Sequence, residues 1–291
     1  MRSLTAVAFA RWVPGAGTTG VAMTSTSLVT VRRLCQTSTW AVHRCLPGVA
    51  ALGIILLVSL PGSAQPVGAG KQSSVTAIDI LLEPDAAMIQ HAEIANEHLR
   101  KSFPKGFALG KTHQPHISVL QRYVKTADLD RVYEAIGRVL AEEKPTSWKL
   151  KADKYYYIPW KDIGLAGIVI EPTGDLIRYQ QKLIDAVAPF TVKTGTASAF
   201  VTTKDDPKIN RPTIDYVANF VPNETATKFN PHVTIGLASQ DYLKKMLDEK
   251  FEAFTFSPAG AAVYHLGNFG TAREKLKSWE FKPAAGSRAL R

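Results

Sequence analysis

Two short segments of this chain share one pattern, and that pattern restricts the possible folds more than any other feature. Residues 115–119 read PHISV and residues 231–235 read PHVTI, so each runs proline, histidine, aliphatic, hydroxyl, aliphatic. β-Branched and aliphatic residues favour strands, and proline is tolerated at the first position of a strand. We therefore expect one such strand in each half of the chain.

Alternation along a strand separates the polar and the apolar residues of each segment. His116 and Ser118 share one face of the first strand, and His232 and Thr234 share one face of the second. The aliphatic faces belong in a core, whereas the polar faces need solvent or a cleft. If the two strands lie in lobes that face each other, two imidazoles and two hydroxyls converge.

Such a group of side chains suits the cleavage of a phosphodiester. A neutral histidine can take a proton from an attacking water or hydroxyl, and a protonated histidine can supply one to the departing oxygen. Ser118 and Thr234 can donate hydrogen bonds to the non-bridging oxygens, where charge gathers in the transition state. This chemistry needs no metal ion and no cofactor, and we expect none.

The alternative is that each histidine is a satisfied, partly buried strand residue. Histidine followed two positions later by serine or threonine is a weak pattern, expected about once by chance in a chain of this make-up. The full five-residue pattern is expected in roughly one such chain in a hundred. Its presence twice favours the functional interpretation.

The rest of the chain alternates between strand-like and helix-like segments. Strands are expected at 74–83, 115–121, 148–159, 162–171, 196–203, 213–221, 231–237, 261–270 and 271–281. Helices are expected at 85–103, 127–142, 174–188 and 239–251, with Ser239 as an N-cap. Strands interleaved with few helices indicate an α+β fold, here of two related lobes. Loops at 203–214 and 222–230 are expected to rim the cleft between them.

The first 69 residues differ in composition from the rest. They contain five arginines, no acidic residue, and both cysteines, Cys35 and Cys45. Residues 46–60 are apolar and uncharged, Arg44 precedes them and small residues follow, which is typical of a secretory signal. We expect residues 1–69 to be an export segment, cleaved after Ala64 or Ala69, and 70–291 to be the folded domain.

Export implies a periplasmic or secreted protein, with an uncleaved membrane anchor as the alternative. Translation from Met23 instead of Met1 would give the signal a more usual length. The folded part contains no cysteine, so we expect no disulfide, thiolate metal site or cysteine nucleophile there.

At residues 115–119 and 231–235 the sequence resembles the 2H phosphoesterase superfamily, which includes RNA 2',3'-cyclic phosphodiesterases, also called 2'-5' RNA ligases. In element order the resemblance extends over about residues 74–283. It implies a bilobal fold of two antiparallel-sheet lobes with outer helices and a central cleft. It also implies hydrolysis of a 2',3'-cyclic phosphate that leaves a 2'-phosphate, with His232 activating water and His116 protonating the leaving oxygen. The 116 positions between the two histidines exceed the usual spacing in smaller members, and extra material at 203–230 accounts for this.

Other candidates are weaker. Aromatic faces can stack on a nucleobase, although packing in a core or at a rim is the commoner fate. Alternation favours Tyr157 for stacking, and Phe200 and Phe229 are similar candidates. Ordinary solvated or structural roles are expected for four other histidines and three loop cations, namely His91, His98, His113, His265, Lys204, Lys208 and Arg211.

The sequence thus predicts a hydrolase of the phosphodiesterase class that acts on a nucleotide or on a short RNA with a cyclic phosphate. We expect a monomer with no obligatory protein partner, and export favours the scavenging of external nucleotides. Two alternatives stay open: a nucleotide-binding module without catalysis, and a 2'-5' RNA-end ligase.

Overall fold

The computed structural model describes residues 74–110, 113–204 and 206–281. Its strands are β1 Val75–Pro84, β2 Ile117–Lys125, β3 Leu150–Trp160, β4 Ile163–Ile170, β5 Thr191–Val192, β6 His232–Ser239, β7 Phe254–Phe256, β8 Pro258–Leu266 and β9 Ala272–Glu280. Its α-helices are α1 Ala86–Ser102, α2 Leu129–Glu143, α3 Gly174–Val187, α4 Arg211–Asn223 and α5 Gln240–Asp248. The predicted export segment, 1–69, lies outside the described residues.

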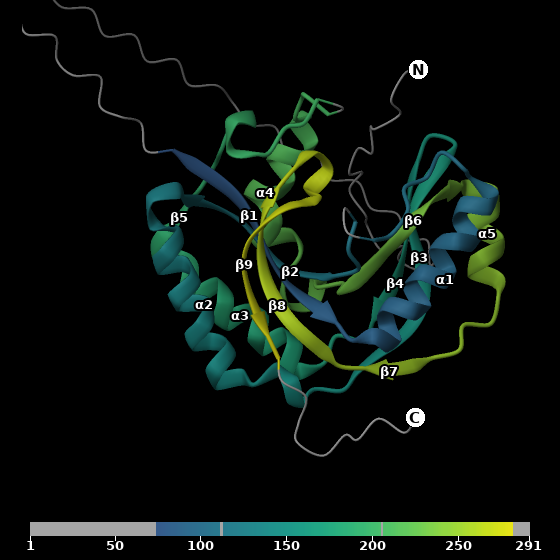
Figure 1. The fold of residues 1–291 in the computed structure, drawn as a ribbon, viewed down its shortest axis with the longest axis horizontal. Coiled ribbons are helices and arrows are strands. Elements are labelled where there is room, and N and C mark those ends of the chain that lie inside the picture. Colours follow the sequence, from purple (N-terminus) through teal and green to yellow (C-terminus); the bar gives the residue numbers. More distant parts are fainter. Residues whose placement is uncertain (1–73, 111–112, 205, 282–291) are drawn as a thin grey trace, which may run out of the picture. The chain divides into compact units, whose positions relative to one another are not determined.

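All nine strands form one curled antiparallel sheet (Figure 1). Eight of them follow the order β7-β3-β4-β6-β2-β1-β8-β9, and β5 pairs with β2. The predicted α+β class and the antiparallel pairing are therefore confirmed. Two antiparallel-sheet lobes were expected, and in the structure their strands belong to one sheet, whose parts meet between β2 and β6 at the register pair Ile117–Val233.

The two parts of the sheet do not correspond to the two halves of the chain. One part holds β1, β2, β5, β8 and β9, and the other holds β3, β4, β6 and β7. The C-terminal hairpin β8–β9 therefore returns to the N-terminal strand β1, beside which β8 pairs over seven positions. Each part still contributes one Pro-His strand, which places both motifs at the central junction.

Four helices cover one face of the sheet. Figure 1 shows α1 and α5 beside the strands β3, β4 and β6, with α2 and α3 together beside β1 and β2. Their apolar residues share one core with alternate residues of the strands, which include Ile78, Ile80, Ile117, Val233 and Ile235. The helix α4 packs on the opposite face, where its Val217 contacts a second core formed by Ala77, Tyr123, Ala199, Phe200 and Leu266.

The start of α1 and its contact with β6 follow from particular side chains. Asp85 caps the helix by accepting hydrogen bonds from the amides of Ala87 and Met88, at 3.1 and 3.3 Å. The buried Asn96 donates to the carbonyl of Ile235 at 2.7 Å. Gly236 has φ 143°, and a Cβ there would lie 2.8 Å from Nδ2 of the Asn96 side chain. Both the backbone conformation and the space at this position therefore require glycine.

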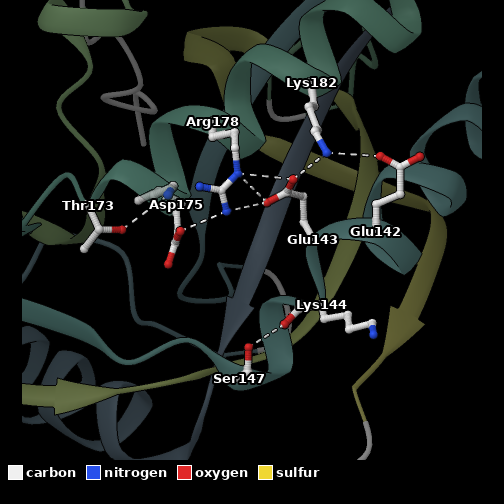
Figure 2. A network of polar contacts seen from close by, with 9 residues as sticks. Glu142, Glu143, Lys144, Ser147, Thr173, Asp175, Arg178 and Lys182 are labelled. Atoms are coloured by element: carbon white, nitrogen blue, oxygen red, sulfur yellow. Dashed lines mark hydrogen bonds and ion pairs between the residues drawn. The ribbon is translucent and has the colours of Figure 1, made fainter.

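An ion-pair network joins α2 to α3 (Figure 2). The Glu143 side chain is only 4% exposed, and it accepts from Arg178 at 2.8 Å and from Lys182 at 2.7 Å. Arg178 also pairs with Asp175, and Lys182 with Glu142. The hydrogen bonds from Arg178 are the main reason why the pKa of Glu143 is lowered.

Two predicted strands are wrong. Residues 213–221 belong to the helix α4, which Asn210 caps by accepting from the Thr213 amide at 2.8 Å. Their β-branched composition suggested a strand, but the buried Thr213, Val217 and Phe220 are spaced four and three positions apart, as on one face of a helix. Residues 196–203 form a 3₁₀ turn at Ala197–Ala199 followed by irregular backbone. The short strands β5 and β7 were not predicted.

The other elements lie where they were expected, including α5 with Ser239 as its N-cap. No helix within the described ranges is both long enough and apolar enough to cross a membrane.

Candidate active site

The junction between β2 and β6 brings the two motifs onto one face of the sheet. Ile117 and Val233 are direct partners and both are fully buried in the main core. Continued by one residue in each direction, this antiparallel register puts Ser118 opposite His232 and His116 opposite Thr234. All four polar side chains therefore share the face opposite to the core. The two histidines are diagonal neighbours in this register, and such neighbours have Cα atoms about 7–8 Å apart in general.

Both imidazoles are held in the same way. Nδ1 of His116 is 2.7 Å from the carbonyl oxygen of Gln114, and Nδ1 of His232 is 2.8 Å from that of Asn230. A carbonyl can only accept, so Nδ1 carries the proton in both rings. When the ring is neutral, Nε2 is then left with a free lone pair. The same local geometry thus gives each motif histidine one nitrogen that can exchange a proton with a ligand.

Burial changes the protonation of His232. It lowers the pKa of this imidazole, and the positive charge of His116 lowers it further, while the bond to the Asn230 carbonyl acts in the opposite direction. A histidine with a lowered pKa is neutral at neutral pH and can accept a proton.

Ser118 is bonded to a residue that the sequence did not single out. Asp79 in β1 is fully buried, and its Oδ2 accepts from the Ser118 hydroxyl at 2.6 Å and from the Gln121 amide at 3.3 Å. Burial raises the pKa of Asp79, against the opposing effects of His116, Ser118 and Gln121. The available signal was an acidic residue in the middle of an otherwise apolar strand, which is rarely placed there without a role.

The hydroxyl of Thr234 is in a different situation. The residue is half-buried, and no hydrogen bond joins its hydroxyl to another group within the described part of the chain. Of the two motif hydroxyls, that of Thr234 is therefore free to donate to a ligand, whereas that of Ser118 already donates to Asp79.

The prediction of Tyr157 as a stacking residue needs a correction, because its neighbour Tyr156 is the tyrosine beside the motifs. The Tyr156 ring contacts the edge of His232, with centroids 4.9 Å apart and an interplanar angle of 64°. It reaches β6 across Gly167, where a Cβ would clash with the Tyr156 ring. Tyr157 lies on the other face, where it packs against the main core. The alternation argument that selected Tyr157 therefore chose the wrong face of the strand.

The two phenylalanines proposed for base stacking are also in cores. Phe200 is 6% exposed and packs edge-on against Tyr123, and Phe229 is 7% exposed in the main core. Neither ring presents a face to a ligand. Sequence alone could not separate a buried aromatic from a cleft aromatic, because both occur in apolar surroundings.

The helix α4 adds ionisable groups to the motif face. Burial raises the pKa of Glu224, directly after this helix, to about 7. Burial also raises the pKa of Tyr216 well above its usual value, and the negative charges of Glu224, Tyr156 and Asp79 contribute. Glu224, Tyr156 and Asp79 therefore each lie within electrostatic range of Tyr216. The predicted extra material at 203–230 supplies this helix.

A small cavity of about 30 Å³ opens beside His116. Gln114, Tyr264 and Arg273 line it, and Tyr264 donates to the Gln114 side chain at 2.9 Å. Among the described residues no carboxylate lies within ion-pair distance of Arg273, so its charge is available to an anion. A larger cavity of about 430 Å³ is lined in part by the same Gln114 and by Lys275, which pairs with Glu83. Neither cavity is lined by His232.

The remaining predicted candidates have structural or solvated positions. His91 stacks on Phe254, His113 on Phe107, and His265 bonds to the carbonyl of Ala199 at 2.9 Å. His98, Lys204 and Lys208 are exposed, and Arg211 pairs with Asp215. Within the described ranges, no group of three or more His, Cys, Asp or Glu side chains is arranged to hold a metal ion.

Among the solved structures that resemble this chain are two of similar coverage, although by sequence no family model and no curated protein matches it. One is TT0787 of Thermus thermophilus, at 14% identity and a TM-score of 0.40, covering 71% of this chain and 98% of the other. The second is E. coli LigT complexed with 3'-AMP, at 13% identity and a TM-score of 0.33, covering 70% and 97%.

Proposed function

We propose that this protein is a metal-independent phosphodiesterase of the 2H type that hydrolyses a 2',3'-cyclic nucleotide or a cyclic phosphate at an RNA end. One observation carries the proposal: the pairing of Ile117 with Val233 places two similarly held histidines and two hydroxyls on one face. Diagonal neighbours on an antiparallel pair have Cα atoms about 7–8 Å apart, a spacing at which two imidazoles can lie on either side of one phosphorus atom.

In this mechanism His232 is the general base. Its lowered pKa keeps the ring neutral, and its Nε2 takes a proton from water as the water oxygen attacks phosphorus. His116 is the general acid, and its protonated Nε2 supplies a proton to the departing ribose oxygen as the P–O bond breaks. Before the substrate binds, the ionised carboxylate of Asp79 lies within electrostatic range of His116 and favours its protonated form.

Substrate binding uses the groups around this pair. Thr234 donates to a non-bridging oxygen of the phosphate, and Arg273 beside His116 offers a charge to the same or a neighbouring phosphate. The Tyr156 ring, in edge contact with His232, takes the role of aromatic platform that was first assigned to Tyr157. The expected product carries a 2'-phosphate.

We also propose that the protein acts outside the cytoplasm, because the composition of residues 1–69 fits a secretory signal. Mass spectrometry of protein recovered from the medium or periplasm tests this: a mature N-terminus after Ala64 or Ala69 is expected. An intact first segment in a membrane fraction would instead favour an anchor.

An assay of the purified protein against a panel of nucleoside 2',3'-cyclic phosphates and linear diesters, in the presence of a chelator, tests the function. We expect turnover of a cyclic phosphate and a 2'-phosphate product, which phosphorus NMR identifies. Saturable binding with no product from any diester would favour a binding module. Joining of RNA ends without hydrolysis would favour a ligase.

A further inference from the structure

The hydrogen bond between Ser118 and Asp79 conflicts with the usual role of a motif hydroxyl. Ser118 has one proton, and its oxygen is 2.6 Å from Oδ2 of Asp79. While Asp79 is ionised, its oxygens can only accept, so the Ser118 proton must point to Asp79 and away from any phosphate. In that state Ser118 presents only lone pairs to an anion, which would oppose binding.

The surroundings of Asp79 favour its neutral form. The residue is fully buried in β1, and its second oxygen, Oδ1, has no hydrogen-bond partner among the described protein atoms. Burial of a carboxylate with one oxygen unpaired disfavours the charge, and burial is the main cause of the raised pKa of Asp79.

Few charged groups surround Asp79. His116 faces it from beside β2, Tyr264 is its register partner on β8, and Tyr216 approaches from α4. Lys275 of β9 contacts the ring of Tyr264 and pairs with Glu83. Among these groups only His116 acts on Asp79 as a positive charge. A bound phosphate would pair with that charge and leave Asp79 without it.

We propose that Asp79 is a positioning residue that binds a proton when the phosphate binds and thereby turns Ser118 into a hydrogen-bond donor. The inference rests on the phosphodiesterase function proposed above. One proton from solvent adds to Oδ2 of Asp79, and the new O–H donates to the Ser118 oxygen. The Ser118 hydroxyl then turns its own proton to a non-bridging oxygen of the phosphate. Beyond this O–H bond no covalent bond forms or breaks.

Two substitutions at Asp79 separate this role from a purely electrostatic one. Asp79→Asn supplies an N–H donor to Ser118 at every pH, so kcat should stay within about threefold of wild type. Asp79→Ala removes the donor and should lower kcat about a hundredfold, the lower end of the loss for one donor to developing charge. If Asp79→Asn is as inactive as Asp79→Ala, the ionised form is the working form and the proposal is wrong.

The pH profile gives a second readout. In wild type both the proton on Asp79 and that on His116 must be present, so kcat/KM should fall on the basic side with the steepness of two groups. In Asp79→Asn the fall should have the steepness of one group. A matched control is Asp85→Asn, which makes the same chemical change at the N-cap of α1 and should leave the shape of the profile unchanged.

Two further comparisons exclude a merely structural effect. The loss from Asp79→Ala should disappear in a Ser118→Ala background, because Asp79 acts through Ser118. Calorimetry in buffers of different ionisation enthalpy, with a nucleoside 2',3'-cyclic phosphate and the His232→Ala protein, should show about one more proton taken up than in His232→Ala/Asp79→Asn. Equal uptake in the two proteins overturns the proposal. A wild type that neither binds nor cleaves the cyclic phosphate ends the proposed function itself, which distinguishes the two failures.

Discussion

The backbone of Ile117 pairs with that of Val233, and this pair joins β2 to β6. The two strands begin at this point and run away from it in opposite directions, since the sheet is antiparallel. Each strand therefore contributes its first residues, and so its histidine and hydroxyl, to the junction. The relationship explains how residues 116 positions apart in the chain come to share one face.

The histidine pair is tested most directly by removing each imidazole. His116→Ala and His232→Ala should each lower kcat by roughly two to four orders of magnitude, the range for general acid–base groups. Steady-state assays with a nucleoside 2',3'-cyclic phosphate measure this. His98→Ala, which removes an exposed histidine of α1, is the matched control and should keep the wild-type rate. Near wild-type rates in both motif variants would contradict the assignment.

The pH dependence should show the effect of burial on His232. The base must be neutral, so kcat/KM falls as pH drops through the pKa of His232. Because that pKa is lowered, the acid limb should have its midpoint below about 6.5, the usual value for histidine. A pH–rate profile and NMR titration of the His232 ring measure this, and a midpoint above that value in both would be inconsistent with a buried base.

Tyr156 and Tyr157 should differ in what they lose on substitution. Tyr156→Ala removes the ring beside His232 and should raise KM or lower kcat about tenfold, while Tyr156→Phe keeps the ring and most of the activity. Tyr157→Ala removes core packing and should cost about 2–4 kcal/mol of stability, at the lower end for aromatic truncation because the ring is partly exposed. Kinetic assays and denaturant unfolding of the three variants give the comparison. The opposite pattern would show that Tyr157 lines the site.

Glu143 should stabilise the fold in a pH-dependent way. Its pKa is lowered in the folded protein, so its contribution is present above the unfolded value of about 4.5 and is lost as pH falls through the folded value. Glu143→Gln should therefore lower Tm by about 2–4 °C at pH 7 and have little effect at pH 3. Glu142→Gln, whose side chain is 64% exposed, is the matched control with little effect at either pH. Thermal melts of both variants at pH 7 and pH 3 measure this. Equal Tm shifts of Glu143→Gln at the two pH values would refute the prediction.

The local sequence was sufficient to predict helices and strands wherever periodicity and composition indicated the same element. The strand β1, the motif strands, the closing hairpin and α1, α2, α3 and α5 lie where the patterns predicted them. It failed at α4, because Ile214, Val217 and Val221 favour strands intrinsically while the Asn210 cap and the spacing of its buried residues stabilise a helix. A cap bonds to the backbone three residues later, and packing on β2 then selects the helix.

The sequence by itself determined which residues form the motif strands and which side chains share a face, because alternation along a strand is local. Only the tertiary structure decided that the two strands meet at one register pair and that Tyr156, not Tyr157, lies beside His232. It also decided that Ser118 donates its hydrogen bond to Asp79. These facts depend on which strands become neighbours in the sheet. Strand pairing is selected by the burial of the whole apolar face of the sheet. That face is formed by residues far apart in the chain, so no single segment of the sequence determines the pairing.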